Sequence, residues 1–259
     1  MNVATSPAAL AGVSPEEWQI RCDLAALYRL VAYHRWTDFI YTHLSARLPG
    51  PDHHFLINKY GVNFHEMRAS DLVKIDLHGN VVEEGDISTR RVNAAGFTIH
   101  SAIHMARPDL TCVVHTHTAA GIAVSAQKDG LLPLSQHACK FYGRIAYHGY
   151  EGIALDLDER ARLVADLGSE HKAMILRNHG LLVGGTSIAE AFHMIYMLER
   201  ACAAQVAALS GGREIVLPPH EVCAHTAEQF RKGENDEHYA MVWDAALRLI
   251  EGGKPDYRS

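Results

Sequence analysis

The stretch VVHTHTAAG, residues 113–121, closes a short apolar run with two histidines that are one residue apart. Alternate residues of a β-strand point to the same face, so His115 and His117 are expected to project side by side. Two imidazoles so placed can converge on one metal ion, with Zn–N distances of about 2.0–2.1 Å. The alternative is that they are ordinary polar histidines at a strand end, because this spacing alone is a weak signal.

A third histidine occupies a similar position further along the chain. In ILRNHGLLVGG, residues 175–185, His179 ends another apolar run between Asn178 and Gly180. The glycine allows a tight turn and leaves space beside the imidazole ring. Three neutral imidazoles with an open coordination position are typical of a catalytic rather than a structural metal site. Zn²⁺ is the first expectation, and Mn²⁺, Fe²⁺ or Co²⁺ are alternatives because imidazole discriminates weakly among them.

The composition bounds the class of protein. With 259 residues, 48% hydrophobic and 21% charged, the chain is expected to form one globular domain. The net charge of −6 offers no basic surface for nucleic acid or an anionic membrane. No apolar run approaches the roughly 18 residues of a membrane helix, and the N-terminus lacks a secretory pattern. Five scattered cysteines without a CxxC pair favour a reducing compartment, and we expect a cytoplasmic protein.

Hydrophobic periodicity predicts alternating strands and helices after a flexible lead-in at residues 1–14. A capping box at Ser14 begins a helix over about 15–35, and Pro108 ends another. Intermixed strands and helices favour a three-layer α/β or α/β/α domain over 15–259, with a helical C-terminal extension from about 213. Strands are expected at 40–48, 54–58, 110–114, 144–148, 172–176 and 181–184, with two more inside 72–84. Helices are expected at 94–107, 119–127, 157–168 and 187–209, with one or two over 225–250.

Long parts of the sequence resemble the class II aldolase/adducin family. The matching text comprises FLINKYG (55–61), SDLVKIDLHGNVVEEG (70–85), residues 93–135, IAYHGYEGI (145–153) and ILRNHGLLVGGTSIAEAF (175–192). Within the family, the chain is most similar to the adducin head and to bacterial proteins of adducin-like type. The resemblance implies an α/β/α sandwich with a central, mainly antiparallel sheet, and a cyclic homotetramer with sites between subunits. It also implies that His115, His117 and His179 hold a divalent metal, which stabilises the enediolate when a C–C bond breaks.

The chain departs from the aldolase pattern at the catalytic base. Sugar-phosphate aldolases of the family carry a glutamate about nineteen residues before the histidine pair, and an ungapped count places Gly96 there. Glycine can neither carry a proton nor bind a metal through a side chain. The adducin head shows the same loss. The aldolase mechanism therefore cannot be transferred directly.

The family's phosphate-binding positions are altered as well. The segment expected to hold phosphate reads Thr42-His43-Leu44-Ser45, and the serines before the missing glutamate are Ala94 and Ala95. Because phosphate needs several donors, a non-phosphorylated substrate is expected, with His43 as a candidate carboxylate ligand. Asn58, Tyr60 and Gly61 fall where the family's substrate loop lies and are further candidate substrate contacts.

The general acid is less well defined by the sequence. His137 and Tyr142 follow the histidine pair at about the distance at which some aldolases place a catalytic tyrosine, and either could reach a neighbouring subunit's metal. The competing interpretation is that both are polar loop residues. We expect His100 and His104, one helical turn apart, to lie on a surface or interface, and His193 to pack within its helix.

Three functions follow from these features. The leading one is a metal-dependent lyase that cleaves a C–C bond, by aldol cleavage or decarboxylation, in a small oxygen-rich substrate. Gly96 favours instead a non-catalytic adducin-like oligomerisation module. A metal-dependent oxygenase is a third possibility, since three histidines with open positions also suit Fe²⁺. The substrate, the native metal and the group that replaces the glutamate are not set by the sequence.

Overall fold

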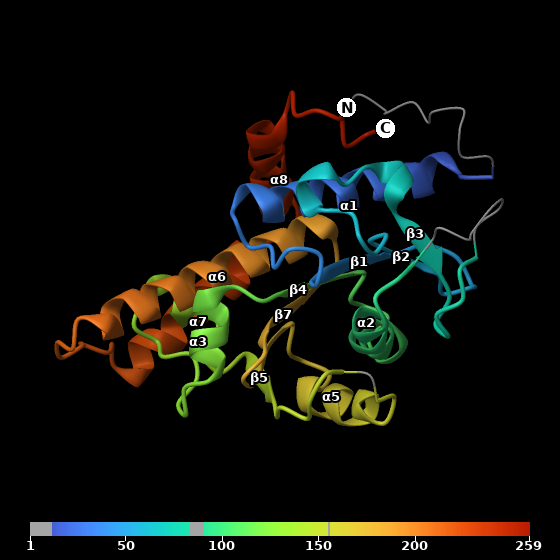
Figure 1. Cartoon of the computed structure of the whole chain (residues 1–259). Helices are drawn as coiled ribbons and strands as arrows, with labels where there is room; N and C mark the ends of the chain where they lie inside the picture. The colour runs from blue at the N-terminus through green and yellow to red at the C-terminus, as the bar shows by residue number, and fades with distance from the viewer. Residues whose placement is uncertain (1–11, 83–90, 155) are drawn as a thin grey trace.

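A seven-stranded sheet forms the centre of the protein, with helices on both sides of it (Figure 1). The structure is a computed structural model that describes residues 12–82, 91–154 and 156–259. The strand order is β3-β2-β1-β4-β7-β6-β5. Every neighbouring pair is antiparallel except β5 and β6, which run parallel. The strands are β1 (His43–Arg47), β2 (Phe55–Ile57), β3 (Val73–Ile75), β4 (Cys112–Thr116), β5 (Ile145–His148), β6 (Ala173–Leu176) and β7 (Gly180–Gly185).

Helices cover both faces of this sheet. On one face lie α1 (Pro15–Tyr33), α3 (Ala119–Ser125), α6 (Ile188–Ser210) and α8 (Asp236–Ile250), and on the other lie α2 (Ala94–Ala106) and α5 (Glu159–Leu167) (Figure 1). The short α4 (Gln136–Cys139) and α7 (His220–Gly233) pack together beside α6. Two 3₁₀ turns, Phe64–Glu66 and Ala69–Asp71, precede β3. The expected three-layer α/β/α sandwich with a mainly antiparallel sheet is confirmed.

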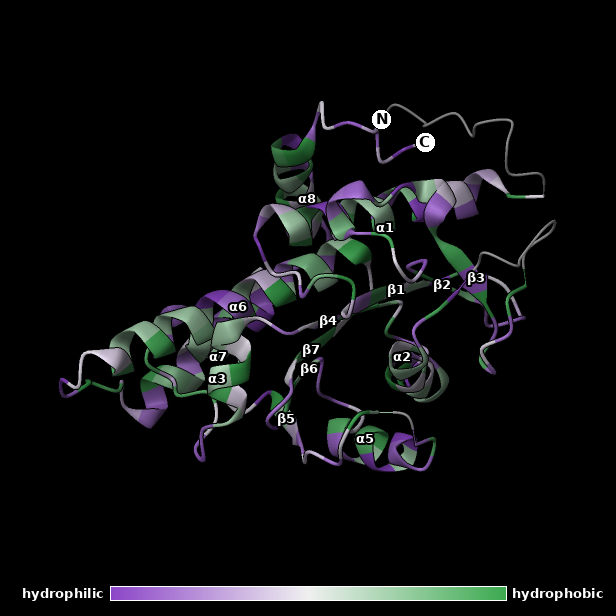
Figure 2. Cartoon of the chain, in the orientation of Figure 1, coloured by the Kyte–Doolittle hydropathy of each residue, from purple (hydrophilic) through white to green (hydrophobic). Residues whose placement is uncertain are grey.

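The alternating sides of β4 explain the two hydrophobic layers. Cys112 and Val114 pack under α1 and α6, whereas Val113 packs under α2 and α5. Both sides of the sheet therefore carry a buried hydrophobic cluster, and Figure 2 shows hydrophobic residues along the strands between helices of mixed character. The side of β4 that carries Val113 continues to His115, so that imidazole lies on the α2 side of the sheet.

Several element boundaries differ from the sequence expectation. The first strand begins at His43 rather than residue 40, and 72–82 contains one strand and an isolated bridge between Ile75 and Val81. The turn after β3 is held by Asp76, whose carboxylate accepts hydrogen bonds from the backbone N–H groups of His78 and Asn80 at 2.8 and 2.9 Å. Residues 83 and 84 of that segment, and 1–11 of the lead-in, lie outside the described residues.

The start of α1 and the end of α5 lie at the residues that the sequence predicted. Ser14 accepts a hydrogen bond from the backbone N–H of Glu17 at 3.1 Å, with Pro15 at the start of α1. The carboxylate of Glu17 does not complete a capping box, because it pairs with Arg21 and Lys74 instead. Gly168 ends α5 with a φ of +64°. Within the described residues, no helix combines the length and apolarity needed to cross a membrane.

The hydroxyl of Tyr28 connects α1 to the sheet. It is fully buried, donates to the carbonyl of Leu44 at 2.5 Å, and accepts from the backbone N–H of Leu44 at 2.8 Å. The same oxygen lies 2.9 Å from Oδ1 of Asn58 and 3.1 Å from its backbone nitrogen. One side-chain atom thus satisfies polar groups of β1 and of the segment after β2.

We expect Tyr28→Phe to lower the free energy of unfolding by about 2–4 kcal/mol, because several buried polar groups would lose their partner. Tyr33→Phe at the exposed end of α1 is the matched control and should change stability by less than about 0.5 kcal/mol. Urea unfolding followed by circular dichroism measures both. Equal effects of the two substitutions would contradict this role for Tyr28.

Candidate metal centre

Three segments bring His115, His117 and His179 together at one end of the central strands β4 and β7. His115 lies in β4, His117 directly follows that strand, and His179 lies in the turn between β6 and β7. The turn needs unusual backbone: Asn178 has a φ of +55°, and a Cβ at Gly180 would lie 2.3 Å from the carbonyl oxygen of Thr116. Glycine at 180 therefore allows the turn to approach β4 closely enough for the three rings to meet.

The ring nitrogens of this triad converge. Nε2 of His115 lies 2.7 Å from Nε2 of His117. The ring of His179 is centred 4.8 Å from each of the other two rings. If one ring nitrogen is taken from each of the three histidines, these three nitrogens all lie within 4.8 Å of one another. The three predicted ligands are thus placed as the sequence pattern suggested.

Hydrogen bonds to the outer nitrogens set the tautomers of two members of the triad. Nδ1 of His115 lies 2.9 Å from the carbonyl oxygen of Leu181, which can only accept, so Nδ1 carries the proton. Nδ1 of His117 donates in the same way to the carboxylate of Asp38 at 3.0 Å. Such partners fix the orientation of metal-ligating histidines and raise their basicity. In the neutral rings, both Nε2 atoms present lone pairs to the centre.

Burial favours the neutral form of two of these imidazoles, His115 and His179. Desolvation, followed by the neighbouring histidines, lowers the pKa of His115 well below its ordinary value. The same causes lower the pKa of His179 to about 4. Two lone pairs facing each other at 2.7 Å repel unless a positive ion lies between them. A proton could bridge two rings, whereas a divalent metal would be bound by all three, so the donor set fits a metal ion.

The space left by Gly96 is filled by His43. A Cβ built on Gly96 would lie 2.6 Å from Cδ2 of the His43 ring, closer than real side chains approach. His43 is 2% exposed, pairs directly with His115 across the β1–β4 ladder, and its ring is centred 5.0 Å from that of His115. The space beside Gly96 of α2, the position that the ungapped count assigns to the aldolase glutamate, is therefore occupied by an imidazole from strand β1.

His43 begins a buried chain of polar side chains. Its Nδ1 lies 2.8 Å from Nε2 of His100, and Nδ1 of His100 lies 2.5 Å from the hydroxyl of Ser45, which also contacts His104 at 2.7 Å. The expectation that His100 and His104 lie on a surface is wrong, since they are 0% and 1% exposed. The apolar period of α2 gave no sign that the facing strand would supply polar partners.

The candidate substrate residues lie near the β1–β2 end of the sheet. Asn58 is buried and its amide oxygen is engaged by Tyr28, but its Nδ2 has no partner within the described part of the chain. The hydroxyl of Thr42, next to His43, is also buried and has no hydrogen-bond partner among the described residues. Tyr60 is half-buried with its backbone N–H bonded to Arg91, and Gly61 is exposed with a φ of +97°.

His137 and Tyr142 lie away from these residues in the chain's own fold. Both are half-buried and belong to the α4 region, and the hydroxyl of Tyr142 lies 2.8 Å from Nδ1 of His220 in α7. Among the interactions of the described residues, neither contacts the triad. Their proposed acid role therefore requires the metal of a neighbouring chain.

Three residues near the triad were missed by sequence reasoning. Asp38 binds His117, and Tyr150, 57% exposed, has its ring 6.4 Å from that of His179. Glu199 of α6 accepts hydrogen bonds from Thr116 and Thr118, at 2.5 and 2.7 Å, on either side of His117. Asp38 and Tyr150 lie in loops without a spacing signal. Glu199 is an acidic residue on the buried face of an apolar helix, which could have marked it.

Comparison with known proteins places the chain in a family. The model of the Class II Aldolase and Adducin N-terminal domain matches residues 22–206. The crystal structure of an aldolase II superfamily protein from Pseudomonas syringae is 58% identical with a TM-score of 0.89, covering 95% of this chain and 98% of that one. The chain belongs to the class II aldolase/adducin family, as the resemblance of its motifs indicated.

Two further relatives are proteins of different kinds, an aldolase and an adducin. L-fuculose 1-phosphate aldolase from Glaciozyma antarctica PI12 is 29% identical with a TM-score of 0.82, over 98% of this chain and 97% of that one. Alpha-adducin of Rattus norvegicus is 48% identical over 191 residues, which is 74% of this chain and 26% of the adducin. The sequence is thus similar both to an enzyme over nearly its whole length and to about a quarter of a much longer protein.

We expect Gly96→Ala to destabilise the protein by about 1–3 kcal/mol, because the added methyl would overlap the ring of His43. In a His43→Ala background the same substitution should be neutral or stabilising, since alanine is the better helix former. Urea unfolding of the two single variants and the double variant measures the coupling. The same effect of Gly96→Ala in both backgrounds would show that the two positions do not compete for space.

Glu199 should make stability depend on pH. Burial raises its pKa to about 7, against the smaller opposing effect of the two threonine hydrogen bonds. Between pH 4.5 and 7 the unfolded chain loses this proton while the folded protein keeps it, so stability falls as pH rises. At about 1.4 kcal/mol per pKa unit, we expect the advantage of Glu199→Gln over the wild type to grow by roughly 3 kcal/mol across that range.

Urea unfolding of both proteins in the presence of a chelator, at several pH values from 4.5 to 8, tests this expectation. A stability difference between Glu199→Gln and wild type that does not change with pH would refute it.

Proposed function

We propose that the protein is a divalent-metal-dependent lyase that breaks a C–C bond in a small, oxygen-rich, non-phosphorylated substrate. The convergence of three imidazoles, two with their outer nitrogens fixed by Leu181 and Asp38, is the observation that carries this proposal. The 29% identity to an L-fuculose 1-phosphate aldolase over nearly the whole chain supports the same reaction class. Zn²⁺ is the preferred metal, with Mn²⁺, Fe²⁺ or Co²⁺ as alternatives.

A bound divalent cation would supply Lewis-acid stabilisation of the negative charge that develops on substrate oxygens during C–C cleavage. The chain's own residues prepare the site for it. The carbonyl of Leu181 and the carboxylate of Asp38 orient two of the rings, and Glu199 holds the threonines that flank His117. Burial of His115 excludes water from one side, while the exposed ring of Tyr150 marks the open side by His179.

The proton-transferring group has to differ from the glutamate of the aldolases. Gly96 cannot serve, and His43 occupies its space. Tyr150, whose ring is centred 6.4 Å from that of His179, is a candidate proton donor on the solvent side. His137 and Tyr142 remain candidates for an acid supplied by a neighbouring chain, which fits the proposal of a homotetramer with sites between subunits.

The substrate-side donors suit a carboxylate better than a phosphate. The Nδ2 group of Asn58 and the hydroxyl of Thr42 are buried without partners in the described residues, and His43 follows Thr42. Two such donors can satisfy a carboxylate, whereas a phosphate takes more and is usually met by charged groups. Tyr60 and Gly61 are proposed as the outer wall of the same region. Aldol cleavage and loss of CO₂ are both compatible with this arrangement.

A non-catalytic adducin-like module is the second candidate function. The 48% identity to alpha-adducin and the absence of a carboxylate at Gly96 favour it. In that case the triad would serve folding or assembly rather than turnover. A metal-dependent oxygenase is a weaker alternative that rests on the same three histidines. For each candidate, we propose a cytoplasmic protein without nucleic-acid or membrane partners.

Metal analysis of protein purified without added metal tests the proposal. We expect wild type to carry a divalent ion that His115→Ala lacks, while the exposed His78→Ala keeps it. The metal-loaded protein should cleave a member of a panel of small hydroxy-keto acids and sugar acids, detected as released aldehyde or CO₂, and His115→Ala should lose at least 100-fold in rate. A wild type unable to bind Zn²⁺ or Mn²⁺ at micromolar concentration would eliminate the lyase. A metal-loaded protein inactive on the whole panel would favour the adducin-like module.

A further inference from the structure

A second cluster of metal-ligating groups lies where α6, α7 and α8 meet. His193 belongs to α6, Glu234 directly follows α7, and His238 lies in the first turn of α8. One ligand atom of each lies within 4.8 Å of those of the other two. The cluster shares no residue with the triad or with the side chains that the proposed lyase chemistry uses.

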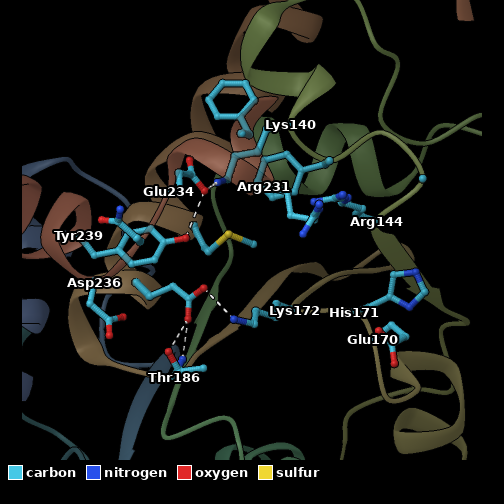
Figure 3. A pocket seen from close by; sticks show the side chains of 16 residues that line it. Lys140, Arg144, Glu170, His171, Lys172, Thr186, Arg231, Glu234, Asp236 and Tyr239 are labelled. Carbon is cyan, nitrogen blue, oxygen red and sulfur yellow. Dashed lines mark hydrogen bonds and ion pairs between the residues drawn. The ribbon is translucent and has the colours of Figure 1, made fainter. Parts of the chain in front are cut away.

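Glu234 divides its two oxygens between different partners. Oε1 lies 2.8 Å from Nε2 of the buried His193. Oε2 accepts from the ammonium of Lys140 and from the hydroxyl of Tyr239, the latter at 3.2 Å (Figure 3). Oε1 is therefore held by His193, while Oε2 is held by Lys140 and Tyr239. The carboxylate is fixed in place by groups outside the cluster.

His238 has an unsatisfied nitrogen in this cluster. Its Nε2 is buried and has no hydrogen-bond partner within the described part of the chain. The backbone of the residue is fixed, because its N–H donates to the N-cap side chain of Asn235 at 2.9 Å. Its ring packs edge to face against His193, with the centroids 5.2 Å apart. A buried imidazole nitrogen without a partner is costly unless a ligand completes it.

The chemistry of the three groups matches a zinc ion. Burial of Glu234 opposes its ionisation, but hydrogen bonds from His193 and Lys140 outweigh burial and lower its pKa to about 2. Two imidazoles and one carboxylate are a ligand set found at zinc sites with an open fourth position. The cluster borders a groove of about 720 Å³, lined among others by Gln136 and Thr226, which leaves room for a water molecule as the fourth ligand.

We propose that His193, Glu234 and His238 form a second zinc site, with three protein ligands and water at the fourth position. The ion would fasten the junction of α7 and α8 (the α7–α8 elbow, residues 234–235) to α6. His193 and Glu234 have their ligand atoms 2.8 Å apart, and a ligand atom of His238 lies within 4.8 Å of each. Binding requires His193 to present the Nε2 lone pair to the metal, so the proton that Nε2 shares with Glu234 moves to Nδ1 of the neutral ring, or to solvent from a protonated ring. Lys140 stays on the far oxygen of Glu234, where it balances the charge of the carboxylate and limits the affinity for the ion.

The consequence for the fold is a cross-link between segments far apart in sequence. Residues 211–219, between α6 and α7, form no helix or strand, and most of them are exposed. Trp243 and Ala246 attach α8 to the main core, and Cys223 and Ala227 are the buried residues of α7. A zinc ion at the elbow would therefore stabilise the extension against local opening.

Zinc titration of chelator-treated protein, with a chromogenic chelator as competitor, tests the site by stoichiometry. We expect wild type to bind two equivalents and His238→Gln one. His225→Gln, an exposed histidine on α7, is the matched control and should bind two. The triple variant His115→Ala/His117→Ala/His179→Ala should keep one equivalent, which separates this site from the proposed lyase metal.

Hydrogen exchange of wild type with and without zinc localises the effect independently of any variant. We expect at least tenfold slower exchange of amides in 220–250 when zinc is added, with no such change in His238→Gln. If His238→Gln binds as much zinc as wild type, or if zinc leaves exchange in 220–250 of wild type unchanged, the second site is wrong. A triple variant that binds no zinc would also contradict it. One equivalent in both wild type and triple variant, with 220–250 of wild type still protected by zinc, would overturn only the lyase centre.

Discussion

The close pairing of β4 with β7 is the constraint on which the rest of the structure depends. β4 is bonded on one side to β1 and on the other to β7, and it is buried on both faces. At its end, Gly180 lies against the carbonyl of Thr116, where a methyl group would not fit. This contact brings the β6–β7 turn over the end of β4. Without this contact, His179 would still follow the strand next to β4 in the sheet, but its ring would not reach those of His115 and His117.

The face of the sheet under α2 is unusual because it joins a polar interior to an apolar one. Ile99, Ile103 and Val113 pack in a dry layer, yet His43, Ser45, His100 and His104 form a buried polar chain beside them. Burial lowers the pKa of His43, His100 and His104, so the chain is held as neutral imidazoles. Neutral rings can share hydrogen bonds without the cost of a buried charge. This arrangement lets the sheet carry a row of imidazoles next to the triad.

The sequence predicted the layers, most element positions and the convergence of His115, His117 and His179, because strand alternation and a glycine turn are local signals. It could not predict contacts set by tertiary packing. Asp38 reaches His117 from a loop, His43 fills a space on another element, and His100 and His104 face strand residues rather than solvent. The α6–α8 cluster was hidden for the same reason, since its three ligands belong to three elements whose packing angle the sequence does not state. Local periodicity identifies faces, but not what lies opposite them.

The overlap between position 96 and His43 also limits how this chain could change. A glutamate does not fit at position 96 while His43 keeps its ring in place, because even the first carbon of the new side chain would collide with it. Shortening His43 first would leave a hole beside His115 and free His100 of its partner. We expect either substitution made alone to destabilise the protein, so a glutamate at position 96 requires a second substitution at His43. The departure from the aldolase pattern is therefore built into the packing, and reversing it requires rebuilding a corner of the core.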